Sequence, residues 1–101
     1  MSSQDFSALH LHDAILQSVA LNWELKACRF ELRAFAKPGE YATPHVLEFT
    51  GVSLLAAPHV EAWGSSSSVL SCSQSSGSFF ITMQSGDIIE VAASGYTYAA
   101  A

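Results

Sequence analysis

Residues 78–93, SFFITMQSGDIIEVAA, predict a β-hairpin. On both sides of a polar centre, bulky apolar residues occupy every second position: Phe79, Ile81, Met83, Ile89 and Val91. This alternation is typical of strands that bury one face. The centre, Gln84-Ser85-Gly86, suits a three-residue loop whose third position is left-handed, a conformation that glycine adopts without strain. We therefore expect Phe79 opposite Val91 and Ile81 opposite Ile89.

A second hairpin is predicted upstream, within residues 15–34. Apolar residues keep one parity in its first strand and the other parity in its second: Val19, Leu21 and Trp23, then Cys28, Phe30, Leu32 and Ala34. Pairing these faces sets Trp23 opposite Cys28 around a loop of residues 24–27, and it sets Leu21 opposite Phe30 and Val19 opposite Leu32. The side chains of the other face are polar or small, which is typical of a sheet face that is exposed to solvent: Ser18, Ala20, Asn22, Arg29, Glu31 and Arg33.

The segments between the hairpins are shorter. KPGEYATPH (37–45) holds two prolines and a glycine, which is typical of a loop. HVLEFTGV (45–52) predicts a strand with Leu47 and Phe49 on one face, and Gly51 marks a bulge or its end. SLLAAPHVEAW (53–63) fits either a strand or a helical turn, and Pro58 ends both.

Residues 61–77, EAWGSSSSVLSCSQSSG, are rich in serine. A flexible linker would separate two foldable units, but the hairpin that follows needs the earlier strands to cover its apolar face. We therefore expect a loop at Ser65–Ser68, a strand over 68–73 and a second loop over 74–78. A nucleophile elbow requires G-x-S-x-G, which GSSSS lacks, so no catalytic residue is predicted.

These segments predict a single mainly β domain over residues 1–101. Its antiparallel strands, about six to eight in number, would form a sandwich, a roll or a partly open barrel. Little helix is expected, because the longest candidate, Ser7–Leu16, could make only about two turns. Residues 1–8 are mostly polar and are expected to be frayed.

Charge limits the choice of partner. The chain has 101 residues and a formal net charge of −5. All four basic residues lie between Lys26 and Lys37, so the acids dominate elsewhere; this repels nucleic acid and anionic membranes and suits a basic protein. Only 13% of residues are charged, which favours a homodimer, with Arg29 and Arg33 facing acids of the second subunit. No signal peptide or membrane-spanning run is recognised, and we expect a cytoplasmic protein.

Histidines offer an alternative function. LHLHDA (9–14) brings His10, His12 and Asp13 together in the sequence, and with His59 these are the ligand types of a zinc site. The alternative is thus a small metal-binding or ligand-binding domain. No H-E-x-x-H is present, and Cys28 and Cys72 match no zinc motif. The main expectation is therefore no bound metal or cofactor.

Five segments occur in order between Leu11 and Val91: LHDAIL, VALNW, LEFTGVSLL, EAWGSSSSV and MQSGDIIEV. Together they resemble a family of small, mostly uncharacterised bacterial proteins with an LHDA-type opening, a central F-x-G-V and a W-G-x-S loop. The layout more distantly resembles some immunity proteins of bacterial toxin systems. The family has a proline before W-G, where this chain has Ala62.

The resemblance implies a compact β domain. It implies no activity and no catalytic residues for this chain. Its motif positions define a hypothetical binding surface: His12, Asp13, Trp63, Gly64 and Ser66. Trp63 would line a pocket there or close one end of the core. The main functional hypothesis is accordingly a non-enzymatic protein-interaction module, with an immunity-like role as its narrower form.

Overall fold

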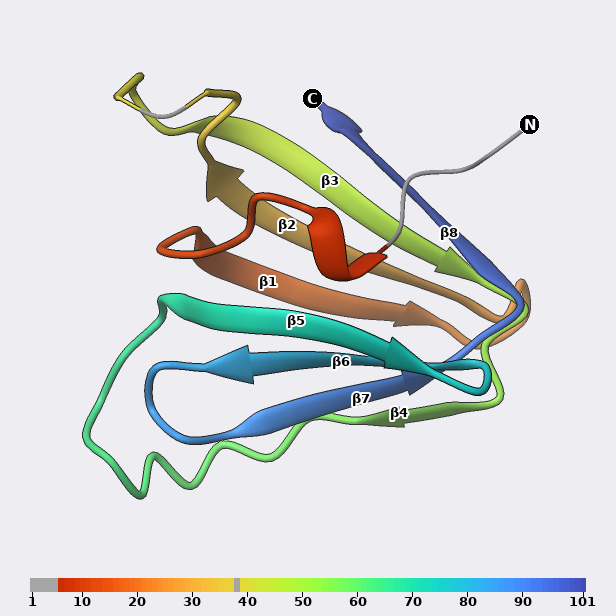
Figure 1. Ribbon diagram of the computed structural model, residues 1–101. Coiled ribbons are helices and arrows are strands. Elements are labelled where there is room, and N and C mark those ends of the chain that lie inside the picture. The colour runs from red at the N-terminus through yellow and green to blue at the C-terminus, as the bar shows by residue number, and fades with distance from the viewer. Residues whose placement is uncertain (1–5, 38) are drawn as a thin grey trace.

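The structure, a computed structural model that describes residues 6–37 and 39–101, is a sandwich of two four-stranded antiparallel sheets (Figure 1). The first sheet has the order β1-β2-β3-β8 and the second the order β4-β7-β6-β5. The strands are β1 (Ile15–Asn22), β2 (Ala27–Ala34), β3 (Thr43–Thr50), β4 (Leu54–Ala56), β5 (Val69–Ser75), β6 (Ser78–Met83), β7 (Ile88–Ala92) and β8 (Gly95–Ala100). The predicted mainly β, antiparallel class is confirmed.

The β6–β7 hairpin has the predicted register. Phe79 pairs with Val91 and Ile81 pairs with Ile89. The loop is closed by two backbone hydrogen bonds, in which Gly86 N donates to Met83 O at 3.0 Å and Met83 N donates to Asp87 O at 2.8 Å. Gly86 has a φ of 95°, so the glycine occupies the left-handed position that the loop requires.

The β1–β2 hairpin is shifted by two residues from the predicted register. Leu21, not Trp23, pairs with Cys28, and the turn comprises residues 23–26. Asn22 explains the shift, because its Oδ1 accepts a hydrogen bond from Leu25 N at 3.0 Å and so fixes where the turn begins. A shift of two residues preserves the faces, so the prediction of which side chains point inward holds for the paired residues, while Trp23 is moved into the turn and is 86% exposed.

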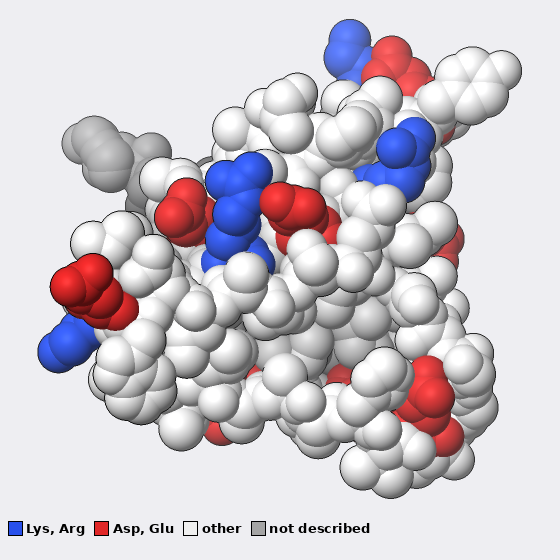
Figure 2. Space-filling view, turned by 180° about the vertical axis from the view of Figure 1, so that it is seen from behind, with Lys and Arg blue, Asp and Glu red and all other residues white. Residues whose placement is uncertain are grey.

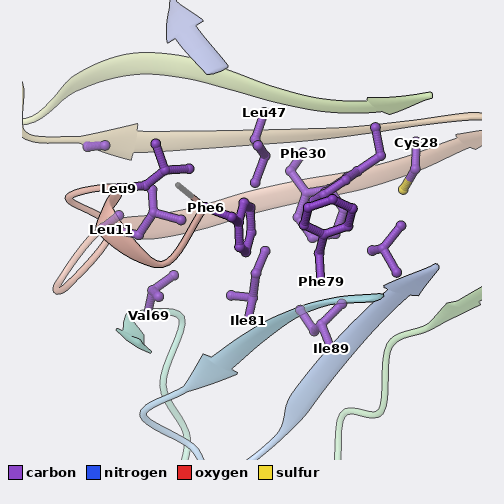
Figure 3. Packing of buried hydrophobic residues seen from close by; sticks show 14 of the residues in the cluster. Phe6, Leu9, Leu11, Cys28, Phe30, Leu47, Val69, Phe79, Ile81 and Ile89 are labelled. Atoms are coloured by element: carbon purple, nitrogen blue, oxygen red, sulfur yellow. The ribbon is translucent and has the colours of Figure 1, made fainter. Parts of the chain in front are cut away.

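The N-terminal segment is not frayed where it is described. Residues 1–5 lie outside the described residues, but Phe6–Ala8 form a 3₁₀ helix, η1, and Phe6 is fully buried. Its ring contacts Phe79 and Tyr96, with ring centroids 5.0 Å and 5.1 Å away. Figure 3 shows Phe6, Leu9 and Leu11 between the two sheets. The expected fraying is therefore wrong for these residues, because an aromatic ring from this segment fills the centre of the core.

Two boundaries also differ from the prediction, and a third segment, which the sequence left open between a strand and a helical turn, begins as a strand. β5 continues to Ser75, and Ser76-Gly77 alone turns the chain into β6, with φ values of 48° and 83° that suit a two-residue hairpin turn. β3 begins at Thr43, inside the predicted loop. The ambiguous segment 53–63 starts with a three-residue strand, β4, and continues as a loop.

Charged residues are absent from all four edge strands, β1, β4, β5 and β8. The charged residues of the strands lie on β2, β3 and β7: Arg29, Glu31, Arg33, Glu48 and Glu90. This distribution is the reverse of the usual one, in which charges protect sheet edges from pairing with another chain.

Of the two arginines predicted for a dimer contact, Arg29 is balanced by acids of its own sheet, and Arg33 donates a hydrogen bond to Ala42 O at 3.0 Å. Arg29 Nε lies 3.1 Å from Glu31 Oε2, and Arg29 also pairs in register with Glu48 of β3. Figure 2 shows blue and red side chains side by side in this cluster. Arg29 therefore offers no unbalanced positive charge for the predicted dimer contact, and the homodimer stays a prediction. None of the helices in the described residues is long and apolar enough to cross a bilayer.

Candidate functional site

One end of the sandwich gathers every residue of the hypothetical binding surface. We call it the loop end; it consists of residues 11–14, the 57–68 loop between β4 and β5, and the 84–87 turn between β6 and β7. Gln84 Nε2 donates to Asp13 Oδ1 at 2.7 Å, and Trp63 N donates to Ser85 O at 2.9 Å. The β6–β7 turn thus connects the first and the second segment.

Asp87 holds the loop in place. This buried carboxylate accepts hydrogen bonds from Val60 N at 2.8 Å, Glu61 N at 3.1 Å and the Ser85 hydroxyl at 2.7 Å. The Val60 amide foremost, then the Ser85 hydroxyl, lowers the pKa of Asp87 below its ordinary value, although burial opposes the shift. Asp87, with these three partners, forms what we call the Asp87 latch. Sequence reasoning missed it, although an acid directly after the loop glycine was a visible signal.

Trp63 lies flat on the β6–β7 turn. A side chain at Gly86 would place its Cβ 2.8 Å from the Cδ2 atom of the indole, so the ring can lie this close only because position 86 is glycine. The tryptophan is still 69% exposed. It therefore does not close the core, and it is not among the residues that line the pocket between the loop end and β1. Instead, one face of the indole contacts the β6–β7 turn and the rest of the ring is exposed.

The serines of the loop serve the loop itself. Glu61 Oε2 accepts from Ser65 Oγ at 3.2 Å and from Ser66 N at 3.3 Å, and it lies 3.3 Å from His59 Nε2. Ser66 Oγ in turn accepts from Ser68 N at 3.1 Å. These hydroxyls satisfy loop backbone and carboxylate groups, as expected for serine in turns.

His12 and Asp13 are joined, but the four proposed metal ligands are not. His12 Nδ1 bonds Leu70 O at 2.9 Å, and its Nε2 lies 3.6 Å from Asp13 Oδ2. His10 shares with them a shallow hollow of about 380 Å³. His59 pairs with Glu61 instead. Within residues 6–37 and 39–101, no group of three or more histidine, cysteine or acidic residues could hold a metal ion.

A pocket of about 300 Å³ opens between the loop end and β1. Its apolar walls are Leu16, Val19, Ala57, Pro58, Met83 and Ile89. Its polar lining comprises Gln17, Ser18, His59, Ser66, Ser67, Ser85 and Asp87. Apolar walls with a few polar groups are typical of sites that accept one side chain or a small ligand.

Comparison of the chain with protein-family models, curated proteins and solved structures found no match.

Because the contacts of Asp87 hold the 57–68 loop, we expect Asp87→Asn to loosen this loop without unfolding the rest of the domain. The amide N–H groups of Val60 and Glu61 lose a charged acceptor, so we expect their hydrogen exchange to be at least about tenfold faster. Because the pKa of Asp87 is lowered in the folded state, the latch is stable above the ordinary carboxyl pKa of about 3.9 and is lost as pH falls through the lower folded value.

Nuclear magnetic resonance measures both effects. The pH titration of the Val60 amide shift should have its midpoint below about 3.9 in the wild-type protein, and the transition should be absent from the variant. Glu90→Gln, on the neighbouring strand β7, is the control and should leave both amides unchanged. Equal exchange rates in Asp87→Asn and wild type would show that the carboxylate does not hold the loop.

Proposed function

We propose that the protein is a non-enzymatic interaction module that binds a partner protein with its loop end. The exposed Trp63 ring, fixed on Gly86 beside the 300 Å³ pocket, is the observation that carries the proposal. Tryptophan is enriched among the residues that dominate binding energy at protein interfaces. Since the Asp87 latch already orders the loop, binding would cost little additional conformational entropy.

The charges support a basic partner. The loop end exposes the carboxylate of Asp13 and, in part, that of Glu61. Lys37 lines the hollow beside Asp13, and no lysine or arginine follows it in the sequence. An acidic surface attracts a basic protein and speeds its association. An immunity-like role in the cytoplasm, in which the loop end neutralises a basic toxin, is the narrower form of this proposal and rests on the sequence resemblance.

The experiment compares Trp63→Ala with Leu25→Ala. Both side chains are large, apolar and mostly exposed, but Leu25 lies in the β1–β2 turn at the opposite end of the sandwich (Figure 1). The immobilised wild-type protein should retain a basic partner from cell extract, and binding should weaken as salt is raised. Trp63→Ala should weaken binding of that partner at least about tenfold, and Leu25→Ala should not. Retention of the same partner by Trp63→Ala would refute the assigned surface, and an acidic partner would refute the charge argument.

A small metal-binding or ligand-binding domain is the second candidate, favoured by the 380 Å³ hollow beside His10, His12 and Asp13. Metal analysis of protein purified without a histidine tag distinguishes it. Stoichiometric zinc that disappears on His12→Ala would support this candidate over the interaction module.

A further inference from the structure

An open seam runs along one side of the sandwich between β1 and the segment from β4 to His59. Each end of the seam is closed by a backbone hydrogen bond: Leu16 N donates to Ser67 O at 2.9 Å, and Val52 N donates to Lys26 O at 2.8 Å. Between these bonds β1 and β4 are both edge strands, and neither pairs with the other. Every second residue of such an edge directs its N–H and C=O groups outward, available to another strand.

Two hollows lie in the seam, one toward each end. The first is the 300 Å³ pocket already described, where Leu16 and Val19 contribute from β1. The second, of about 510 Å³, lies between Leu21, Trp23 and Lys26 on one side and residues 52–55 on the other. The seam therefore offers apolar recesses along the same strand that offers backbone groups. Seen from this side, the surface below the central charged cluster is recessed and mostly uncharged (Figure 2).

The edge of β1 lacks most of the features that usually prevent an edge strand from pairing with another chain, namely charged residues, prolines and bulges. The strand contains no charged residue and no proline, and its one irregularity is a bulge between Leu16 and Ser18, next to the closed end. Residues 18–22 keep a regular register with β2. A regular, uncharged edge of this kind is a template for strand addition.

The charges at the two ends of the seam differ in sign. Glu61 lies next to the first hollow, because its Oε2 is 3.3 Å from His59 Nε2 and 3.3 Å from Ser66 N, and both of these residues line the hollow. Lys26 borders the second hollow. A bound segment with a basic residue at the Glu61 end and an acidic residue at the Lys26 end would complement both.

We propose that the seam binds an extended segment of the partner protein, which adds a strand to the free edge of β1. The segment carries apolar side chains at alternate positions, because these enter the two hollows, and a basic residue that reaches Glu61. This inference rests on the proposed function and adds to it the form of the partner: Trp63 contacts the partner's surface, and the seam takes an extended part of its chain.

The test uses a capped synthetic peptide of about eight residues, alternating leucine with threonine or glutamine, with arginine at one end and glutamate at the other. Its binding to the isotope-labelled protein is followed by amide shifts and hydrogen exchange. We expect slower exchange within residues 17–22 and shifts at Leu54–Ala56. Leu21→Lys, which places a charge in the second hollow, should weaken binding at least about tenfold.

Ala20→Lys is the matched control, because it adds the same charge to the same strand on the opposite, solvent-facing side. It should bind the peptide like the wild type, and both variants should melt like the wild type. Trp63→Ala should also bind the peptide normally, so failure of the loop-end proposal and failure of the seam proposal are separable. Peptide shifts away from β1, no binding, or equal binding by Leu21→Lys would overturn the proposal. Slower exchange within residues 17–22 on raising protein concentration alone would also overturn it, by placing a second copy of the chain in the seam.

Discussion

Phe6→Ala is expected to lower the free energy of unfolding by about 3–5 kcal/mol, since it removes a fully buried ring and leaves a cavity. The ring contacts Phe49, Phe79 and Tyr96, so both sheets lose a neighbour. For a small domain this is a large part of the total stability, which is of order 5–15 kcal/mol. Urea denaturation followed by fluorescence measures the change.

Tyr41→Ala is the matched control, because it removes an aromatic ring that is 93% exposed. We expect it to change the free energy of unfolding by no more than about 0.5 kcal/mol. If Phe6→Ala were as stable as Tyr41→Ala, η1 would not be docked in the core, and the sequence-based expectation of a frayed N-terminal segment would be restored.

Gly86→Val is expected to cost about 2–5 kcal/mol, for two separate reasons. Position 86 has a φ of 95°, which a β-branched residue adopts only with strain. The new Cβ would also lie 2.8 Å from the Trp63 indole, so the ring must move. Thermal and urea unfolding should both show the loss.

Two comparisons separate the reasons. Gly77 has a φ of 83° but no neighbour within 4 Å of an added Cβ, so Gly77→Val should show the strain alone, about 1–2 kcal/mol. Combining Gly86→Val with Trp63→Ala should relieve the steric part, making the double variant less destabilised than the sum of the two single changes. If Gly86→Val melts like the wild type, the contact between the loop and the turn does not exist as described.

The two hairpins show what sequence can and cannot predict. For β6–β7, the alternation and the turn glycine agree on one register, and the prediction is correct. For β1–β2 the alternation was correct for the faces, but it repeats every two residues and so fits registers two apart equally well. No glycine marks the turn; Lys26 adopts a φ of 52° instead, and the decisive contact is the Asn22 side chain.

Tertiary contacts explain what the sequence did not reveal. Phe6 lies between the polar residues Asp5 and Ser7, with no strand-like alternation to mark it, and its burial depends on rings from β3, β6 and β8. At the loop end, the sequence indicated His12, Asp13, Trp63, Gly64 and Ser66. The residues that hold them, Gln84, Ser85 and Asp87, lie in a turn predicted only for its shape. The contacts of Asp87 join positions 26 and 27 residues apart, which no local pattern encodes.

The position of Phe6 has a consequence for how the chain folds. Its ring comes from the first described element, while Tyr96 comes from the last strand, so this contact cannot form until nearly all of the described chain has left the ribosome. Proteins dominated by such distant contacts fold slowly, over roughly milliseconds to seconds. During that interval the nascent chain exposes the apolar faces of β2 and β3, and β3 is an unpaired edge until β8 joins it, which is the condition under which chains aggregate. We therefore expect the yield of folded protein in cells to depend on synthesis rate and on chaperones more than the stability of the finished fold would suggest.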